Sequence, residues 1–479
     1  PGKIRKLYCM TLPARHAKGE DKIESLLATI VGSEAVSTDP RDLLAYGQDW
    51  TRFFTPTPSA VVFPQSEGQI REIVALARKD HLGLVPSGGR TGLSGGACAT
   101  KGEIVVSFDK MKRVIDFDSS NRSVTVESGF HTAELQEFAK TKNLYYPVDF
   151  ASSGSSQIGG NIATNAGGIR VLRYGMTRDW VSGLRVVTGQ GECLNLNKGL
   201  VKNATGYDLR HLFIGSEGTL GFIVNATMQL TTPPLDASVV LLAIPAMEHC
   251  LTILERFRSK ITLNAFEFFS DKALAHVLTT SDLTHPFTKP SPFFVLLEFE
   301  QNSAETTDLV LEVYDDCAAD GIVTDAVVST SIQQNLELWQ YRERISESIT
   351  RFTPYKNDVS VRISQIPAFL KSIDAVITEQ YPDFEVVWFG HIGDGNLHLN
   401  ILKPEDWTTD RFRSACEDLS RNTLKVVSEY AGSVSAEHGV GLLKKGHLPF
   451  SRSAEEIEAM KLLKAVFDPD GVMNPGKLL

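Results

Sequence analysis

The sequence has few of the patterns that assign a chain at first sight. It contains six cysteines without a CxxC pair or a framework spacing, at positions 9, 98, 193, 250, 317 and 416. Such cysteines are typical of reduced thiols, so we expect a cytoplasmic (bacterial) or mitochondrial-matrix protein and not a secreted one. No hydrophobic run reaches the length of a membrane-spanning helix, and the longest, such as 237–245, fit strands.

The chain also lacks two common nucleotide-binding signatures and an excess of basic residues. GxGxxG does not occur, and no glycine-rich loop ends in the GK[ST] of a P-loop, so a Rossmann nicotinamide site is without its usual mark. The net charge of -10 argues against nucleic acid as a partner, because phosphate binding depends on a basic face. Residues 1–19 are basic without an acid, and we expect a disordered tail there, left from a transit peptide or an expression scar.

The chain of 479 residues is long enough for two or three domains. A β-α-β pattern lies between Val61 and Pro86, with its amphipathic helix near 69–78, and residues 114–129 alternate as in a hairpin. The paired prolines of 231–235 indicate a domain boundary. The second half predicts an α+β domain with an antiparallel sheet covered on one side by helices, from strands near 237–244, 264–269 and 292–300 and helices near 247–260 and 304–320. A helix at 454–467 followed by turns at 468–477 is expected to end the chain.

Three tracts rich in glycine and small polar residues lie within one domain's length, at 87–96, 152–168 and 214–221. Loops of this kind let backbone amides approach an anionic group closely. One such tract is better explained by tight turns and bulges. Three together favour a single extended ligand that carries a pyrophosphate, held by many main-chain donors.

Histidines and a carboxylate gather in two glycine-punctuated segments, GHIGDGNLHLN at 390–400 and SAEHGVG at 435–441. The Gly-Asp-Gly between His391 and His398 is turn chemistry that can bring both imidazoles to one side, and His398 shares a strand face with Asn400. Glu437 completes a two-histidine, one-carboxylate set of the kind found in catalytic zinc sites. His438 is then free for proton transfer. The alternative is that both segments are surface loops with satisfied histidines.

Together these motifs resemble the FAD-linked oxidases and dehydrogenases of the vanillyl-alcohol oxidase type, and within them the D-2-hydroxyglutarate, D-lactate and glycolate dehydrogenases. The resemblance runs from about 61 to 477 and rests on PSGGRTGLSGG, IGGNIATNAGGIRVLRYG, TGYDLRHLFIGSEGTLG, GHIGDGNLHLN and NPGK. It implies an α+β architecture: a two-subdomain FAD-binding domain, an α+β cap with an antiparallel sheet, and a small C-terminal segment that returns to FAD. The implied boundaries are a tail with a first helical segment at 1–57, the FAD domain at 58–233, the cap at 234–453 and the C-terminal segment at 454–479.

The resemblance also implies which residues contact FAD. The pyrophosphate would lie on the first tract, the isoalloxazine along the second and third, and Asn474 would return to the flavin. No histidine in these tracts offers an obvious covalent tether, so non-covalent FAD is expected. The implied contacts are Pro86, Ser87, Gly88, Gly89, Arg90, Thr91, Gly92, Ser94, Ser153, Gly159, Gly160, Asn161, Thr164, Asn165, Gly167, Gly168, Tyr174, Glu217, Gly218, Gly221, Ile223 and Asn474.

For the substrate, the resemblance implies a divalent metal, with zinc expected and manganese, iron or cobalt as alternatives, on His391, His398 and Glu437. His438 would be the acid/base and Asn400 a polar contact. Arg342, Ser346 and Lys356 would hold substrate carboxylate, and helical spacing places the first two on one face. The family more often has Thr at position 346, which puts substrate preference in doubt.

The activity implied is oxidation of a D-2-hydroxy acid by hydride transfer to flavin. Two cations and a metal suit a dicarboxylate, which favours D-2-hydroxyglutarate, oxidised to 2-oxoglutarate, over D-lactate, D-malate or glycolate. Electron-transfer flavoprotein or a quinone is the expected acceptor, and a homodimer the oligomeric state to test. Two rival hypotheses are a zinc metallohydrolase, which leaves the glycine-rich tracts unexplained, and a non-catalytic flavin-binding subunit, which leaves the metal set unexplained.

Overall fold

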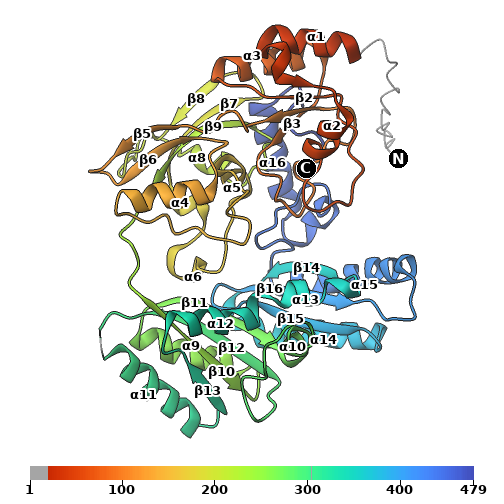
Figure 1. Cartoon of the computed structure of the whole chain (residues 1–479). Helices are drawn as coiled ribbons and strands as arrows, with labels where there is room; N and C mark the ends of the chain where they lie inside the picture. The colour runs from red at the N-terminus through yellow and green to blue at the C-terminus, as the bar shows by residue number, and fades with distance from the viewer. Residues whose placement is uncertain (1–19, 304) are drawn as a thin grey trace.

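The structure is a computed structural model that describes residues 20–303 and 305–479. The basic segment 1–19, for which we expect a disordered tail, and Cys9 within it lie outside the described residues. Figure 1 shows two units: the first contains two sheets and the C-terminal helix, and the second contains one large sheet. No described helix combines the length and hydrophobicity required to cross a bilayer.

The first sheet of the first unit has four strands in the order β1-β2-β4-β3, with β2, β4 and β3 parallel. Helices α1 and α3 cover one face of its buried, Val- and Ile-rich strands, and α2 packs against the other face. Cover on both faces is what parallel strands require. Helix α3 begins after Ser66, whose side chain accepts a hydrogen bond from the Gln69 N–H, and ends at His81 in the left-handed region. The bounds are β1 Val36–Ser37, β2 Ala60–Val62, β3 Leu84–Ser87, β4 Ile104–Ser107, α1 Glu20–Val31, α2 Pro40–Tyr46 and α3 Glu67–Asp80, with a 3-10 turn at Ser33–Ala35.

The second sheet is antiparallel, with five strands in the order β5-β6-β9-β7-β8. It includes the expected hairpin of 114–129, as β5 paired with β6. The second glycine-rich tract is not a continuous loop, because its middle forms helix α5, in which Ile158 and Ile162 are buried one turn apart. The bounds are β5 Val114–Asp118, β6 Ser123–Glu127, β7 Val181–Thr188, β8 Cys193–Leu196, β9 Gly221–Gln229, α4 Thr132–Thr141, α5 Ile158–Thr164, α6 Val171–Tyr174, α7 Thr177–Trp180 and α8 Arg210–Phe213.

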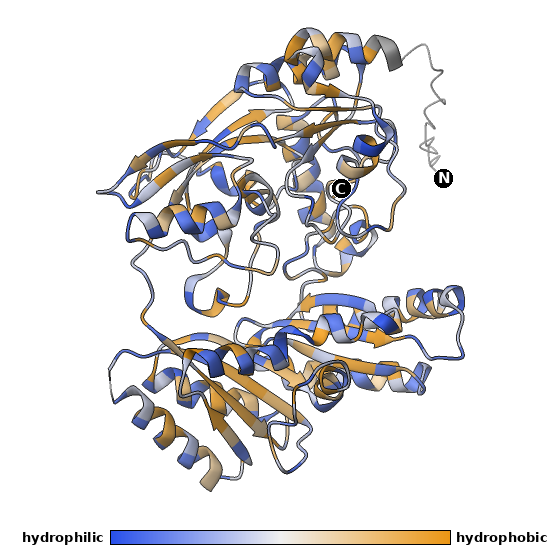
Figure 2. Cartoon of the chain, in the orientation of Figure 1, coloured by the Kyte–Doolittle hydropathy of each residue, from blue (hydrophilic) through white to orange (hydrophobic). Residues whose placement is uncertain are grey.

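The second unit is built on a seven-stranded antiparallel sheet, in the order β13-β10-β12-β11-β15-β16-β14. Figure 2 shows the central strands of this sheet coloured as hydrophobic, whereas the strand β14, YKNDVS, is largely hydrophilic. Helices α9, α11, α14 and α15 pack on one face, and α10, α12 and α13 pack on part of the other. The expectation of helices on one side is therefore wrong, because α10, α12 and α13 were not recognised as cover for the second face.

The strands of the second unit are β10 Ala237–Ile244, β11 Leu263–Ser270, β12 Phe293–Glu300, β13 Asp325–Val328, β14 Tyr355–Ser360, β15 Glu385–His391 and β16 Asn396–Leu402. The helices are α9 His249–Lys260, α10 Asp271–Thr280, α11 Thr306–Ala319, α12 Ile332–Glu343, α13 Ile345–Ser348, α14 Ile366–Gln380 and α15 Thr409–Glu429, with 3-10 turns at Thr350–Phe352 and Ile363–Gln365.

The chain then returns to the first unit. After a 3-10 segment at Lys445–Phe450 and helix α16 at Ala454–Phe467, Met473 pairs with Leu84 at the edge of the first sheet. The Asp468 carboxylate accepts hydrogen bonds from the Val472 and Met473 N–H groups and fixes the turn between helix and strand. The Leu84 N–H donates to the Val472 carbonyl and the Asn474 N–H to the Leu84 carbonyl, so the last residues complete the N-terminal part of the fold. Figure 1 marks the C-terminus within this unit.

Candidate active site

The hairpin of β15 and β16 places two histidines on one face of the large sheet. His391 pairs with Asn396, and His398 pairs with Phe389, so both imidazoles project to the same side. The centroids of their rings lie 5.3 Å apart. The turn between them needs glycine: Gly395 has φ 91°, and a Cβ there would lie 2.3 Å from the Val361 carbonyl oxygen.

Glu437 reaches these histidines from the segment after α15. Ligand atoms of His391, His398 and Glu437 all lie within 4.8 Å of one another. The His398 Nε2 and Glu437 Oε1 atoms are 3.9 Å apart, and the His438 Nε2 atom lies 3.7 Å from the same oxygen. The structure thus gathers the predicted metal ligands and the predicted base, and two imidazoles with one carboxylate fit a divalent ion such as zinc.

Asp358 on β14 organises the segment that carries Glu437 and His438. Its Oδ2 atom accepts hydrogen bonds from three successive backbone N–H groups, those of Ala436, Glu437 and His438, at 3.0–3.1 Å. Its Oδ1 atom accepts one from Asn396 Nδ2 at 2.7 Å. These donors occupy the carboxylate, so Asp358 holds the site together and does not present a free ligand atom, although it lies near Glu437 and His438.

Glu267 on β11 stands behind His391 and Arg342. Its Oε1 atom is 2.9 Å from His391 Nδ1, and its Oε2 atom is 2.9 Å from a terminal nitrogen of Arg342. The side chain of Glu267 is 1% exposed and that of Arg342 is 8% exposed. The carboxylate leaves the Nε2 atom of His391 directed at the other predicted ligands.

Burial and these charges set the ionisation of the cluster. Burial alone would lower the pKa of His391, but the adjacent Glu267 carboxylate raises it to about 9. Burial, together with the Asp358 carboxylate, raises the pKa of Glu437 to about 7. Burial lowers the pKa of His398 and of His438. His398 and His438 are therefore neutral near neutral pH, as a metal ligand and a proton acceptor require. His391 instead holds a proton at this pH, which a bound metal ion would have to displace.

The predicted substrate contacts differ in their surroundings. Lys356 and Asn400 pair across β14 and β16, on the face that carries Asp358 and His398. The Lys356 residue as a whole is exposed, but protein atoms around its ammonium group desolvate it and lower its pKa. Asn400 is buried, and its Nδ2 atom donates to the Val387 and His398 carbonyls.

Arg342 is buried beneath Phe389, with its guanidinium 4.7 Å from the ring centroid. The helix expected to carry Arg342 and Ser346 on one face is interrupted at Arg344. Ser346 is exposed, so the two residues do not share one environment as helical spacing predicted.

The glycine-rich tracts of the first unit lie side by side. A Cβ at Gly88 would lie 3.7 Å from the Cα of Gly160, and one at Gly89 would lie 2.1 Å from the Ser155 carbonyl oxygen. In the third tract, Gly218 has φ 70° and packs against Pro86. The three tracts therefore form one main-chain cradle with little room for side chains, as a pyrophosphate-containing cofactor requires.

Glu217 and Asn474 join this cradle to the histidine cluster. The Glu217 carboxylate accepts hydrogen bonds from the Val440 and Gly441 N–H groups at 2.7 Å, three residues beyond Glu437 and His438 respectively. Asn474 Nδ2 donates to the Gly96 and Glu217 carbonyls at 2.9 and 2.7 Å, and its buried Oδ1 atom has no hydrogen-bond partner among the described residues. An orphaned buried amide oxygen beside the cradle fits a donor on a bound cofactor.

Other residues expected to contact FAD have partners within the protein. Asn161 Nδ2 donates to Thr132, Asn165 Oδ1 accepts from the Arg178 N–H, and Tyr174 Oη lies 3.3 Å from Glu300 of the second unit. Gly221 and Ile223 belong to β9. Arg90 stacks on Tyr46, and the Ser94 carbonyl accepts from the Leu442 and Leu443 N–H groups. The remaining expected contacts, Ser87, Thr91, Gly92, Ser153, Gly159, Thr164, Gly167 and Gly168, lie in the same tracts.

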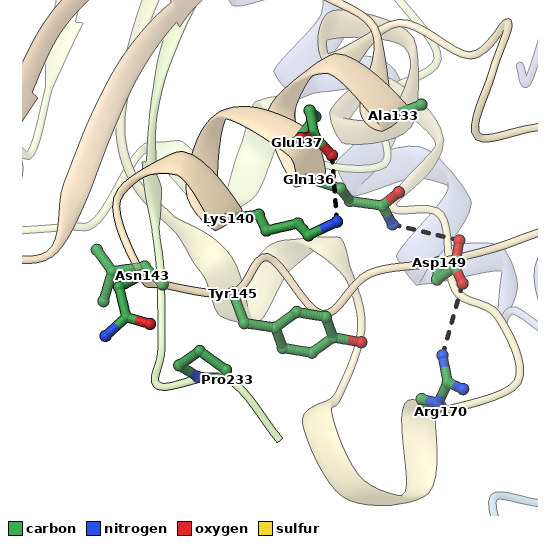
Figure 3. A pocket seen from close by; sticks show the side chains of 10 residues that line it. Ala133, Gln136, Glu137, Lys140, Asn143, Tyr145, Asp149, Arg170 and Pro233 are labelled. Carbon is green, nitrogen blue, oxygen red and sulfur yellow. Dashed lines mark hydrogen bonds and ion pairs between the residues drawn. The ribbon is translucent and has the colours of Figure 1, made fainter. Parts of the chain in front are cut away.

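A separate cavity of about 730 Å³ opens beside α4 (Figure 3). Its charged groups neutralise one another, because Arg170 pairs with Asp149 and Lys140 with Glu137. It contains none of the residues expected from the sequence, and it offers no surplus charge to an anion. It is lined by Ala133, Gln136, Glu137, Lys140, Asn143, Leu144, Tyr145, Asp149, Arg170 and Pro233.

Sequence reasoning missed Glu267 and Asp358. Glu267 interrupts the hydrophobic strand β11, LNAFEFFS, every residue of which is buried, and a lone acid in such a strand signals a buried partner. Asp358 stands two residues after Lys356 on a strand, so the two share a face. Both patterns mark an unusual acidic residue in the sequence, but neither pattern identifies the residue that the acid contacts.

Comparison with known proteins places the chain in a family. Residues 58–197 match the model of the FAD binding domain, and residues 233–478 match FAD linked oxidases, C-terminal domain. A D-2-hydroxyglutarate dehydrogenase of Stutzerimonas stutzeri strain A1501 is 55% identical over 94% of this chain and 97% of the relative. Another from Xanthomonas citri pv. viticola is 49% identical over 92% of this chain and 94% of the relative.

The fold has solved counterparts. The 4-ethylphenol oxidase from Gulosibacter chungangensis, in complex with isoeugenol, superposes with a TM-score of 0.73 at 18% identity and covers 98% of both chains. At that identity the likeness concerns the fold alone. These matches confirm the vanillyl-alcohol oxidase resemblance and the two-part architecture expected from the motifs. The chain therefore belongs to the FAD-linked oxidases, and it is an FAD-dependent oxidoreductase.

Proposed function

We propose that the protein oxidises D-2-hydroxyglutarate to 2-oxoglutarate with non-covalently bound FAD and a divalent metal ion, zinc being the first candidate. The observation that carries the proposal is the convergence of His391, His398 and Glu437 within 4.8 Å, beside His438. The relatives named D-2-hydroxyglutarate dehydrogenase support the choice of substrate.

In the proposal, residues 58–233 hold FAD, 234–453 form the cap that carries the substrate, and 454–479 return to the flavin. Residues 1–57 precede the FAD domain. The cradle of glycine-rich tracts and the orphaned Asn474 amide oxygen support the first and last of these roles. The link from Glu217 to the segment of Glu437 supports a flavin close to the metal ligands.

Each side chain has a role that its surroundings permit. When bound, the metal ion would polarise the substrate hydroxyl as a Lewis acid. His438 would accept the hydroxyl proton at Nε2, while Asp358, 3.6 Å from Nδ1, stabilises the resulting imidazolium. Arg342 and Lys356 would bind the distal carboxylate. Asn400 would line the site, with its Nδ2 atom held by the Val387 and His398 carbonyls. FAD, when bound, supplies the hydride acceptor.

The glycine-rich cradle and the metal-ligand set also argue against two rival functions. A zinc hydrolase leaves the cradle and the family unexplained. A non-catalytic subunit leaves the complete set of metal-ligand side chains unexplained. For the onward electrons we propose electron-transfer flavoprotein or a quinone, because the chain lacks a nicotinamide signature.

The test is anaerobic reduction of the FAD-loaded, zinc-loaded protein, followed by flavin absorbance. D-2-hydroxyglutarate, D-lactate, D-malate and glycolate are compared side by side, with the L-enantiomers as controls. We expect D-2-hydroxyglutarate to bleach the flavin fastest. His391→Ala should keep its FAD and lose both metal and bleaching. A flavin that no 2-hydroxy acid reduces would end the proposal, and normal turnover by His391→Ala would remove the metal from it.

A further inference from the structure

We infer that Glu267 is a positioning residue that couples metal binding to substrate-carboxylate binding, because its two oxygens hold His391 and Arg342 in one buried arrangement. The inference rests on the proposed function, since it needs His391 as a ligand and Arg342 as a carboxylate contact. It goes further by making the two sites interdependent.

The backbone places Glu267 for this role. Phe268 pairs with Gly390 across β11 and β15, so the next antiparallel pair brings Glu267 opposite His391 on the face of the histidine cluster. The turn of the hairpin is tied to the same strand, because the Gly393 N–H donates to the Phe266 carbonyl. Glu267 is thus fixed on both sides by main-chain contacts.

The two oxygens serve different partners. Oε1 accepts from Nδ1 of His391, which fixes the tautomer with Nε2 free for an ion. Oε2 forms the 2.9 Å ion pair with Arg342 but lacks hydrogen-bond geometry to it. The Nε atom of Arg342 is also buried without a hydrogen-bond partner among the described residues. The guanidinium is therefore anchored by charge at one end and keeps donors for a second anion.

A neutral replacement separates this role from simple packing. Glu267→Gln keeps the shape but can accept with one oxygen only, so it cannot serve both partners. A matched control exists on the next strand: Glu298 of β12 is also buried and pairs with Arg170 and Trp339, away from the histidines. Glu298→Gln removes an equally buried charge without touching His391.

The experiment measures zinc affinity of the FAD-loaded proteins by competition with a chelating indicator. We expect Glu267→Gln to bind zinc roughly 10- to 100-fold more weakly than wild type, the usual cost of losing such a supporting partner. Glu298→Gln should bind as wild type does. At saturating zinc, Glu267→Gln should raise the KM for D-2-hydroxyglutarate more than the KM for D-lactate.

Unchanged zinc affinity in Glu267→Gln would overturn the inference, and so would an equal loss in Glu298→Gln. If Glu267→Gln does not fold, Glu267→Asp is measured, which keeps the charge but withdraws it from both partners. Wild-type affinity in that variant would likewise overturn the inference. Failure of the proposed function looks different, because wild type itself would then bind no zinc or show no bleaching.

Discussion

At the scale of single residues, Arg342 gives the sharpest test of substrate choice. Its guanidinium is already engaged by Glu267, and we propose that its remaining donors bind the second carboxylate of the substrate, which D-lactate lacks. Losing a charge-assisted hydrogen bond costs about 1.5–3 kcal/mol, roughly a ten- to hundredfold effect. We expect Arg342→Ala to raise the KM for D-2-hydroxyglutarate by that factor and the KM for D-lactate much less.

The matched control is Arg344→Ala, at the break between α12 and α13, where the side chain is half-buried. It should change neither KM appreciably. Steady-state kinetics with both substrates at saturating zinc decide the question. Equal effects of Arg342→Ala on the two substrates would remove Arg342 from recognition of the distal carboxylate.

Cys98 gives a residue-scale prediction about pH. Burial, with help from the neighbouring Asp49 carboxylate, raises the pKa of its thiol from 9.0 to about 11. At pH 8 the reactive thiolate is then about a hundredfold scarcer in the folded than in the unfolded protein. We expect alkylation of Cys98 by iodoacetamide to be at least a hundredfold slower in the native protein than in guanidinium, and to accelerate as pH rises towards 11.

Peptide mapping of the alkylated protein separates Cys98 from the other thiols, and the guanidinium-unfolded sample is the control. Native and unfolded rates that agree within a few-fold at pH 8 would contradict the buried environment of Cys98. Cys98, Cys193, Cys250, Cys317 and Cys416 are free thiols in the structure, as the spacing of the cysteines predicted.

The sequence alone predicted those site residues whose partners lie nearby in the chain. His391 and His398 meet because a glycine turn lies between them, and such a turn is visible in a linear pattern. Glu267 and Asp358 were missed because their contacts cross 124 and 79 positions, to His391 and Glu437. No local rule fixes the register that brings such positions together.

At the scale of elements, the first glycine-rich tract can be tested by adding one methyl group. A Cβ at Gly89 would lie 2.1 Å from the Ser155 backbone oxygen, and backbone cannot yield as a side chain can. Overpacking of this kind costs about 1–3 kcal/mol. We expect Gly89→Ala to lower the free energy of unfolding by that amount and to be purified with less FAD.

Gly154→Ala is the comparison, because a Cβ at that position meets nothing within 4 Å. It should keep wild-type stability and flavin content. Urea unfolding and the flavin-to-protein absorbance ratio measure the two effects. A Gly89→Ala protein with full FAD and unchanged stability would show that the first and second tracts are not in close contact.

Helices and strands were predicted correctly where a long segment shows regular hydrophobic periodicity. The prediction failed where the regular pattern hides a helix break or a glycine-containing helix. Strand β10 and helices α9 and α16 lie where their patterns placed them. The helix expected through Ser346 is broken at Arg344, and α13 begins at the next residue, a one-residue interruption that hydrophobic periodicity does not signal. Helix α5 was hidden because its two glycines resemble a loop, although Ile158 and Ile162 are spaced as in a helix.

At the scale of the whole molecule, the cofactor should stabilise the fold by an amount that rises with the logarithm of the ratio of its free concentration to Kd. Three tracts and Asn474 converge on one cradle, so FAD binds the folded chain and not the unfolded one. At a free concentration of 100 times Kd, this adds about 2.7 kcal/mol to the free energy of unfolding. Apoprotein titrated with FAD should show this rise in urea unfolding.

Riboflavin is the matched ligand, because it has the same ring system and lacks the pyrophosphate. At equal concentration it should stabilise the apoprotein far less, since the main-chain donors of the cradle would stay unused. Equal stabilisation by the two compounds would indicate that the tracts do not hold a pyrophosphate.

The pairing of Met473 with Leu84 has a consequence for how the enzyme is made. A ribosome presents Leu84 long before Met473 and Asn474 exist, so the flavin cradle cannot close while the intervening polypeptide is still being translated. Tight cofactor binding is then expected only after synthesis of the entire cap. Nascent chains stalled before position 473 should hold FAD less tightly than the complete chain.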